Sequence, residues 1–435
     1  MRIGLAALVE RVRSSFFFVP MLFVVGAAMV GQVSLEIDEA LSDRDVDLPL
    51  TFRATVDSAR AVLSTVATAT ITVAGIAFSV ALLVIQLASS QYSPRVVHGL
   101  FRDPFSKWVM GLVVGTFTFC LVVLRSVRDA LEGGEPVVPT LSVAIALVLG
   151  VTAILAIIAF IDHNAHSMDV SELLHGVTSE ALHAVGLRWP ESSDGGTEIS
   201  EQPPDGDGFL VAFDQYGWIQ QVDGERLLAV APPGGTVRLE VAVGRYAVPG
   251  TPLCTIWPPP PEDDRPPVAR AARAAVMVGR TRTMQQDSSY GIRQLADVAL
   301  RALSSGVNDP TTAQDAIFHM AAVLQEMLRR SGPPRATLGE EGRRLLRPEA
   351  QTHAGAVALG FDELRQAARD KPAVCVYLLE ALHLLCESLP PDAGPAASDP
   401  LRQQARLVLD GCEAADLLPH DLHKVRHTYT RRFGT

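Results

Sequence analysis

The sequence contains little lysine and little cysteine, and neither residue occurs in a pattern that binds a metal. Lysine is found at only three of the 435 positions, and arginine supplies the other basic side chains. The five cysteines are widely spaced, odd in number, and include no CxxC pair. Such usage indicates a reducing compartment and predicts neither a disulfide framework nor a metal site, and nothing in the sequence implies a cofactor.

The motifs of common catalytic sites are also absent from the sequence. There is no phosphate-binding loop, no GxSxG element and no nucleophile paired with a base. The formal net charge of −11 at pH 7 argues against nucleic acid as the main partner. These absences place an enzyme, with its site between residues 287 and 309, below the membrane-protein hypotheses that follow.

What the sequence has in excess is apolar residues, which make up 48% of the chain and are concentrated in its first 161 residues. Four stretches there, 16–33, 62–89, 108–124 and 138–161, approach or exceed the length of about 20 residues that a spanning helix needs. None of them contains a charged residue, which argues against proton relays and voltage sensors. We therefore predict an α-helical integral membrane protein whose residues 1–161 form four transmembrane helices in contact with the lipid bilayer.

The charges next to these spans predict the orientation of the chain. Arginines precede the first span, and the loop between the second and third spans carries two arginines and a lysine against one acid. The first loop, by contrast, is strongly acidic. Because cytoplasmic loops are enriched in Lys and Arg, we expect both termini, and all residues after 161, to be cytoplasmic.

The second span carries a stripe of small and hydroxyl-bearing residues. Steps of three and four residues keep to one face of a helix. Such a face either packs closely against another helix or lines a water-filled path, and the sequence leaves both open. At 1.5 Å per residue, segment 62–90 is about 43 Å long, more than the hydrocarbon core requires. The residues of this hydroxyl stripe are Thr65, Thr68, Thr72, Gly75, Ser79 and Gln86.

The rest of the chain divides into three parts by the period of its apolar residues. Residues 162–207 combine an amphipathic helix with a linker rich in Ser, Gly, Pro and acids. Residues 208–258 alternate with a period of two between Gly and Pro turns, which predicts a small cytoplasmic β domain of the barrel or sandwich type. One of its turns resembles those of barrel-sandwich (lipoyl-like) domains, but the region has no lysine to carry a cofactor. Residues 268–435 are predicted to form an all-α domain, with helices that include 337–347 and 400–431.

This helical region contains a dense group of Arg and Asp residues. Arg293, Asp297 and Arg301 are spaced four residues apart and share one helical face. Asn308 and Asp309 precede Pro310, an arrangement typical of a helix start. The group is interpreted as a well-capped helix start, as a buried ion-pair network that fixes a subunit contact, or as a site for a small anionic ligand. The residues for the last two interpretations are Arg282, Asp287, Arg293, Asp297, Arg301, Asn308 and Asp309.

Three segments carry a resemblance to a known family: QLASSQYSPR at 86–95, RTRTMQQD at 280–287 and DVALRALSSGVNDPTTA at 297–313. With them the chain resembles, over nearly its whole length, the bacterial membrane-protein family catalogued as domain of unknown function 2254. Ser305 stands where the family usually has Pro, which leaves the Asn-Asp-Pro turn intact. The resemblance implies a multi-pass protein of the bacterial inner (plasma) membrane and implies little chemistry.

Two functions fit these observations. The first is an ion or small-solute channel in which a homo-oligomer places the second span of each subunit around an axis, because four helices are too few to enclose a pore alone. The cytoplasmic domains would then build and regulate the assembly. The alternative is a non-conducting, membrane-anchored sensor or scaffold protein whose Thr/Ser face only packs helices.

Overall fold

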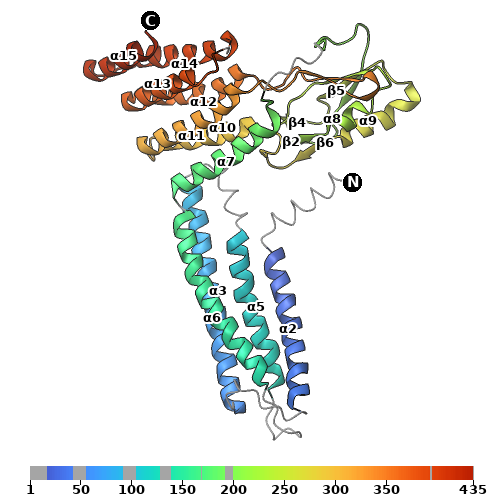
Figure 1. Ribbon diagram of the computed structural model, residues 1–435, viewed down its shortest axis with the longest axis vertical. Helices are drawn as coiled ribbons and strands as arrows, with labels where there is room; N and C mark the ends of the chain where they lie inside the picture. Colours follow the sequence, from blue (N-terminus) through green and yellow to red (C-terminus); the bar gives the residue numbers. More distant parts are fainter. Residues whose placement is uncertain are drawn as a thin grey trace. The chain divides into compact units, whose positions relative to one another are not determined.

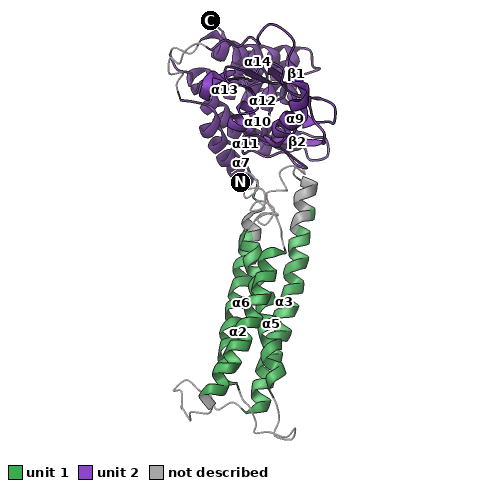
Figure 2. Cartoon of the chain, turned by 90° about the vertical axis from the view of Figure 1, so that its right-hand side faces the viewer, with its two compact units in different colours: residues 1–169 green, residues 170–435 purple. Residues whose placement is uncertain are grey.

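The computed structural model describes residues 17–42, 55–91, 104–127, 139–167, 169–191, 199–391 and 394–434. The chain forms two compact units, residues 1–169 and residues 170–435 (Figure 2). The arginines before the first span, and most of the loop residues whose charges predict the orientation, lie outside the described ranges. The orientation therefore stays a prediction.

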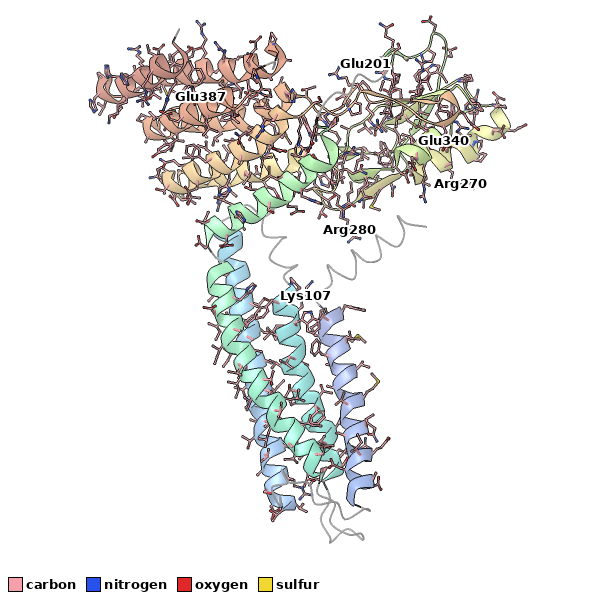
Figure 3. The ribbon with its side chains drawn as sticks, viewed as in Figure 1. Lys107, Glu201, Arg270, Arg280, Glu340 and Glu387 are labelled. Atoms are coloured by element: carbon pink, nitrogen blue, oxygen red, sulfur yellow. The ribbon has the colours of Figure 1, made fainter. Side chains whose placement is uncertain are left out.

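Among its described residues, unit 1 contains four helices that are long and apolar enough to cross a membrane, which confirms the predicted spans (Figure 1). They are α2 (Phe18–Ser42), α3 (Val56–Gln91), α5 (Pro104–Ser126) and α6 (Thr140–Ser167). Each is longer than its predicted apolar stretch, because the helix continues into polar residues. The helices thereby include charged side chains that the predicted spans did not, among them the buried Asp38 of α2 and the buried Lys107, near the start of α5 (Figure 3).

The helix α5 packs on α2, α3 and α6. Two of its glycines let α2 approach closely. A Cβ atom on Gly111 would lie 2.6 Å from the ring of Phe23, and one on Gly115 would lie 3.3 Å from the Phe23 carbonyl oxygen. Small residues at contacts between membrane helices permit such an approach. Toward α3, Leu63 and Phe119 are fully buried in one apolar cluster.

Hydrogen bonds join the end of α2 to the start of α6. One oxygen of Asp38 accepts from the N–H of Leu141 at 2.9 Å, and the other accepts from the N–H and the hydroxyl of Ser142 at 3.0 and 2.6 Å. The Ser142 hydroxyl also contacts Ser34 Oγ at 2.8 Å. Because the first N–H groups of a helix have no partner within it, a carboxylate from α2 serves as the cap of α6.

Unit 2 begins with α7 (Val170–Arg188) and continues with two small sheets (Figure 1). One has the strand order β1–β5–β3–β8–β7 and the other β4–β2–β6; all neighbours are antiparallel except β3 and β8. Neither sheet closes on itself within the described residues. The middle of the chain therefore forms a mixed sheet region, and the structure does not show the predicted barrel. The strands are β1 (Phe209–Ala212), β2 (Gly217–Val222), β3 (Thr236–Leu239), β4 (Tyr246–Ala247), β5 (Pro252–Trp257), β6 (Val276–Gly279), β7 (Ala336–Leu338) and β8 (Arg344–Leu346).

Three of these strands lie within residues 268–435, which were predicted to be all-α. The predicted helix 337–347 is wrong: this segment forms β7 and β8, separated by a turn at Glu340–Gly342. Gly342 has φ +71°, a conformation that ends a helix and that glycine adopts freely. The segment then gains hydrogen bonds from β3 of the sheet region.

Two short helices, α8 (Gly224–Leu228) and α9 (Arg265–Ala274), accompany the sheets.

The remainder of unit 2 is helical, as predicted. The helix α10 packs on α7, α11 and α12, and α13 packs on α11, α14 and α15. The predicted helix 400–431 is two helices, because Pro419 starts a new one: a proline lacks the N–H that a helix interior requires. The helices are α10 (Ser288–Ala302), α11 (Pro310–Arg329), α12 (His353–Ala368), α13 (Pro372–Glu387), α14 (Pro395–Glu413) and α15 (Pro419–Phe433).

Candidate functional site

The hydroxyl stripe of α3 lies on the surface of unit 1. All six of its residues, from Thr65 to Gln86, are exposed. The opposite face of α3 provides the packing side, where Ala67, Thr70, Ala74 and Ala77 are buried. The stripe is therefore not used for packing among the described helices of the same unit.

The hydroxyl groups of the stripe are partly satisfied by the helix that carries them. Thr65 donates to the carbonyl of Ala61 at 2.7 Å, and Thr72 donates to that of Thr68 at 2.7 Å. Ser79 donates in the same way to the carbonyl one turn earlier, at 2.9 Å. A hydroxyl has one hydrogen and two lone pairs, so these oxygens present acceptors to the outside of the unit.

In unit 2, Asp287 forms a buried ion pair with Arg282. The carboxylate has no exposed surface, and its Oδ2 lies 2.5 Å from the Nε of Arg282. The guanidinium of Arg282 also lies over the ring of Tyr290, 5.0 Å from its centroid, and 6.0 Å from that of Trp218 in β2. Burial raises the pKa of Asp287, while the hydrogen bond and charge of Arg282 oppose that rise.

Gly244 and Gln351 complete the surroundings of this carboxylate. Gly244, with φ +85°, approaches so closely that a Cβ atom there would lie 2.0 Å from Asp287 Oδ2. Gln351 donates its Nε2 to Asp287 Oδ1 at 3.3 Å and accepts from the Ser288 hydroxyl at 2.7 Å. The Ser288 oxygen in turn accepts from the indole N–H of the buried Trp189, at 3.1 Å. This network connects the end of α7, the sheet region and the start of α10.

Further along α10, Arg293 forms a second cluster of charges. Its Nε lies 2.8 Å from Asp297, and its two terminal nitrogens donate to the carboxylate of Glu363 in α12 at 2.5 and 3.0 Å. The hydrogen bond to Glu363 raises the pKa of Arg293. Arg301 is exposed in the last turn of α10. The spacing predicted the pairing of Arg293 with Asp297, but it did not reveal Glu363, because that contact depends on how α12 packs.

Asn308 and Asp309 form a third, separate group at the start of α11. Asn308 has φ +49°, and Asp309 accepts from the N–H groups of Thr311 and Thr312 at 3.1 Å and from the Thr312 hydroxyl at 2.6 Å. The hydrogen bond from Thr312 lowers the pKa of Asp309. Asp287 and Asp309 lie at opposite ends of α10, a helix of about 22 Å. The structure therefore does not bring all seven Arg, Asp and Asn residues into one site.

The four spanning-length helices found in the described part of unit 1, together with a second unit of sheets and helices, define a multi-pass membrane protein with a large additional unit. The chain belongs to the family of predicted membrane proteins catalogued as domain of unknown function 2254 (DUF2254), whose model matches residues 13–383. It is 31% identical, over 343 residues, to the uncharacterized proteins Mb1321c of Mycobacterium bovis and Rv1290c of Mycobacterium tuberculosis. These matches cover 78% of this chain and 66% of each relative, slightly under two thirds of their length. No solved structure matches the chain.

Proposed function

We propose that the protein forms homo-oligomers in the membrane, in which the hydroxyl stripes of neighbouring α3 helices surround an axial path for ions or small solutes. The supporting observation is the exposure of the whole stripe on unit 1, opposite the face with which α3 packs. If the stripe packed against other helices of the same subunit, its residues would be buried in unit 1. Both termini are cytoplasmic in this proposal, and unit 2 builds and regulates the assembly.

The direction of the hydroxyl groups supports a path for cations. Thr65, Thr72 and Ser79 donate their hydrogens to carbonyls of the preceding turn. Their oxygens therefore face outward as acceptors, and oxygen acceptors replace the water around a cation but repel an anion. We place Thr68 and Gln86 on the same path because they are exposed on the same face.

The alternative is a sensor or scaffold in which the stripes of two subunits close on each other without an opening. Hydroxyls that already bond to their own backbone are compatible with such a dry contact, because they need no water. In this alternative the protein is oligomeric but does not conduct. Conduction therefore distinguishes the two functions.

The test is cation flux through the purified protein in liposomes, with a cysteine introduced at Thr72. We expect the Thr72→Cys protein to conduct, and to lose most of its flux when a water-soluble, positively charged thiol reagent is added. The matched control is Ile71→Cys, which is exposed on α3 but outside the stripe; it should keep its flux, as should wild-type protein with its native cysteines. Absence of flux in all three proteins would instead support the sensor or scaffold.

A further inference from the structure

Exposed aromatic and apolar side chains gather around the short ladder that β2 forms with β4. Trp218 of β2 lies opposite Tyr246 of β4 in this ladder, and their rings meet edge to face with centroids 5.4 Å apart. Tyr216 comes one residue before β2, and Val248 comes one residue after β4. The exposed fractions are 75% for Tyr216, 50% for Tyr246 and 48% for Val248. The aromatic platform is the name used below for Tyr216, Trp218, Tyr246 and Val248.

A cavity of about 360 Å³ continues the aromatic platform toward β1. Tyr246 of the platform lines it together with Leu210 of β1, whose side chain is 52% exposed. Glu240 also lines the cavity, but its carboxylate is paired with Arg238 at 3.3 Å. The apolar surface therefore extends from β4 to β1, and the carboxylate in its lining is neutralised. Contiguous exposed apolar surface of this kind marks sites that contact a membrane, a ligand or another protein.

The segments that build this surface are basic, although the chain as a whole has 48 acidic and 37 basic residues. Together they contain three arginines and neither aspartate nor glutamate. Arg245 and Arg280 are exposed, and Arg280 lies at the margin of the sheet region in Figure 3; the third arginine belongs to the buried ion pair described above. At the border of the surface, Asp214 is paired with Arg273 at 3.6 Å. The segments are 215–222, 241–252 and 276–286.

Unit 2 is connected to the membrane by a short stretch of chain. The candidate span in α6 ends at His163, and unit 2 begins at Val170. This tether gives the bilayer surface a high effective concentration for any part of unit 2 that binds lipid. Tyr and Trp are enriched at membrane–water interfaces because each has an apolar ring and a polar tip. Basic side chains beside them are attracted to anionic headgroups.

We infer that the aromatic platform is a docking surface for the headgroup region of an anionic lipid bilayer. Tyr216, Tyr246 and Val248 enter the interface between headgroups and acyl chains. Arg245 and Arg280 contact lipid phosphates, whose oxygens match the donors of a guanidinium. The docking surface lies outside the Arg293 and Asp309 clusters that the sequence indicated, and it does not depend on whether α3 conducts.

The experiment measures quenching of a fluorophore on the full-length protein in lipid nanodiscs. The fluorophore is attached through Val248→Cys, and the quencher is a phospholipid with a spin label on its headgroup. The control is Leu418→Cys, a position that is 71% exposed at the start of α15. Four of the five native cysteines are buried, and wild-type protein treated in the same way gives the background. In discs that contain phosphatidylglycerol, we expect quenching at position 248 to be at least threefold stronger than at position 418.

The charge of the docking surface gives a second readout. Replacing both Arg245 and Arg280 by Gln should reduce the quenching at position 248 at least twofold, and so should discs of phosphatidylcholine alone. Arg270→Gln, an exposed residue of α9, should leave the quenching unchanged. The inference is overturned if quenching at position 248 does not exceed that of the control, or if neither the double substitution nor the lipid charge alters it. Protection of position 248 from both the lipid quencher and water-soluble acrylamide would also overturn it, and would indicate that a second copy of the chain covers the platform.

Discussion

At Asp287, a carboxylate without exposed surface contacts residues from three parts of unit 2. Arg282 neutralises its charge, the Gly244 turn lies against one oxygen, and Gln351 donates to the other. The cost of removing two charges from water is offset only while these partners are in place. The contacts of this one residue thus join the sheet region to the start of α10.

Replacing Arg282 by Met should leave the buried Asp287 charge without compensation. We expect the free energy of unfolding to fall by about 3 to 5 kcal/mol, the usual effect of breaking a buried pair. Denaturant unfolding followed by tryptophan fluorescence measures this, since Trp218 lies beside the pair. The control is Lys424→Met, whose pair with Asp421 is exposed and should contribute almost nothing. Equal effects of both substitutions would contradict the assigned role.

The cap of α11 predicts a pH dependence. The pKa of Asp309 is lowered in the folded state by its hydrogen bonds, so the stability it contributes is complete above the unfolded value of about 3.9. That contribution is lost as the pH falls through the lower, folded value. Asp309→Ala should therefore cost about 1 kcal/mol at pH 7 and less near pH 3.

Unfolding midpoints of wild type and variant across this range measure the difference. Asp309→Asn is the matched variant, because Asn also caps helices but does not titrate. The loss of stability caused by Asp309→Asn should also decrease toward pH 3. At pH 7 it should be smaller than the loss caused by Asp309→Ala. A difference between Asp309→Ala and the wild type that stays constant from pH 7 to pH 3 would rule out a contribution from the carboxylate charge.

At the scale of the elements, the two faces of α3 differ in their surroundings. Its Ala-rich face packs within unit 1, and its hydroxyl stripe is exposed. The period of the residues was visible in the sequence, but which face packs was not, because both consist of small residues. For β7 and β8 the sequence carried no usable signal: three-residue strands have no period, and their pairing depends on β3, far earlier in the chain.

The contact of α5 with α2 should depend on the absence of a side chain at Gly111. A methyl group there would lie 2.6 Å from the Phe23 ring, so Gly111→Ala forces the helices apart or displaces the ring, at about 1 to 3 kcal/mol. Thermal unfolding of the protein in detergent measures this. Gly26→Ala in α2, where a Cβ meets nothing within 4 Å, should cause no loss. Comparable destabilisation by both variants would argue against the close contact.

For the whole molecule, the sequence predicted the four spans, the β region and most of the helices. Spanning stretches were predictable because lipid requires a long apolar run. The Arg and Asp residues near α10 were predicted as one group but fall into three, since a helix separates Asp287 from Asp309. Gln351, Glu363 and Trp189 were missed because their contacts arise only when distant elements pack.

The central claim is that the protein assembles around the hydroxyl stripe of α3, and the most direct measurement is single-particle imaging of the full-length protein in lipid nanodiscs. We expect a symmetric ring with Thr68, Thr72 and Ser79 facing a central opening. A monomer, or an oligomer in which these residues are buried between helices without an opening, would contradict it.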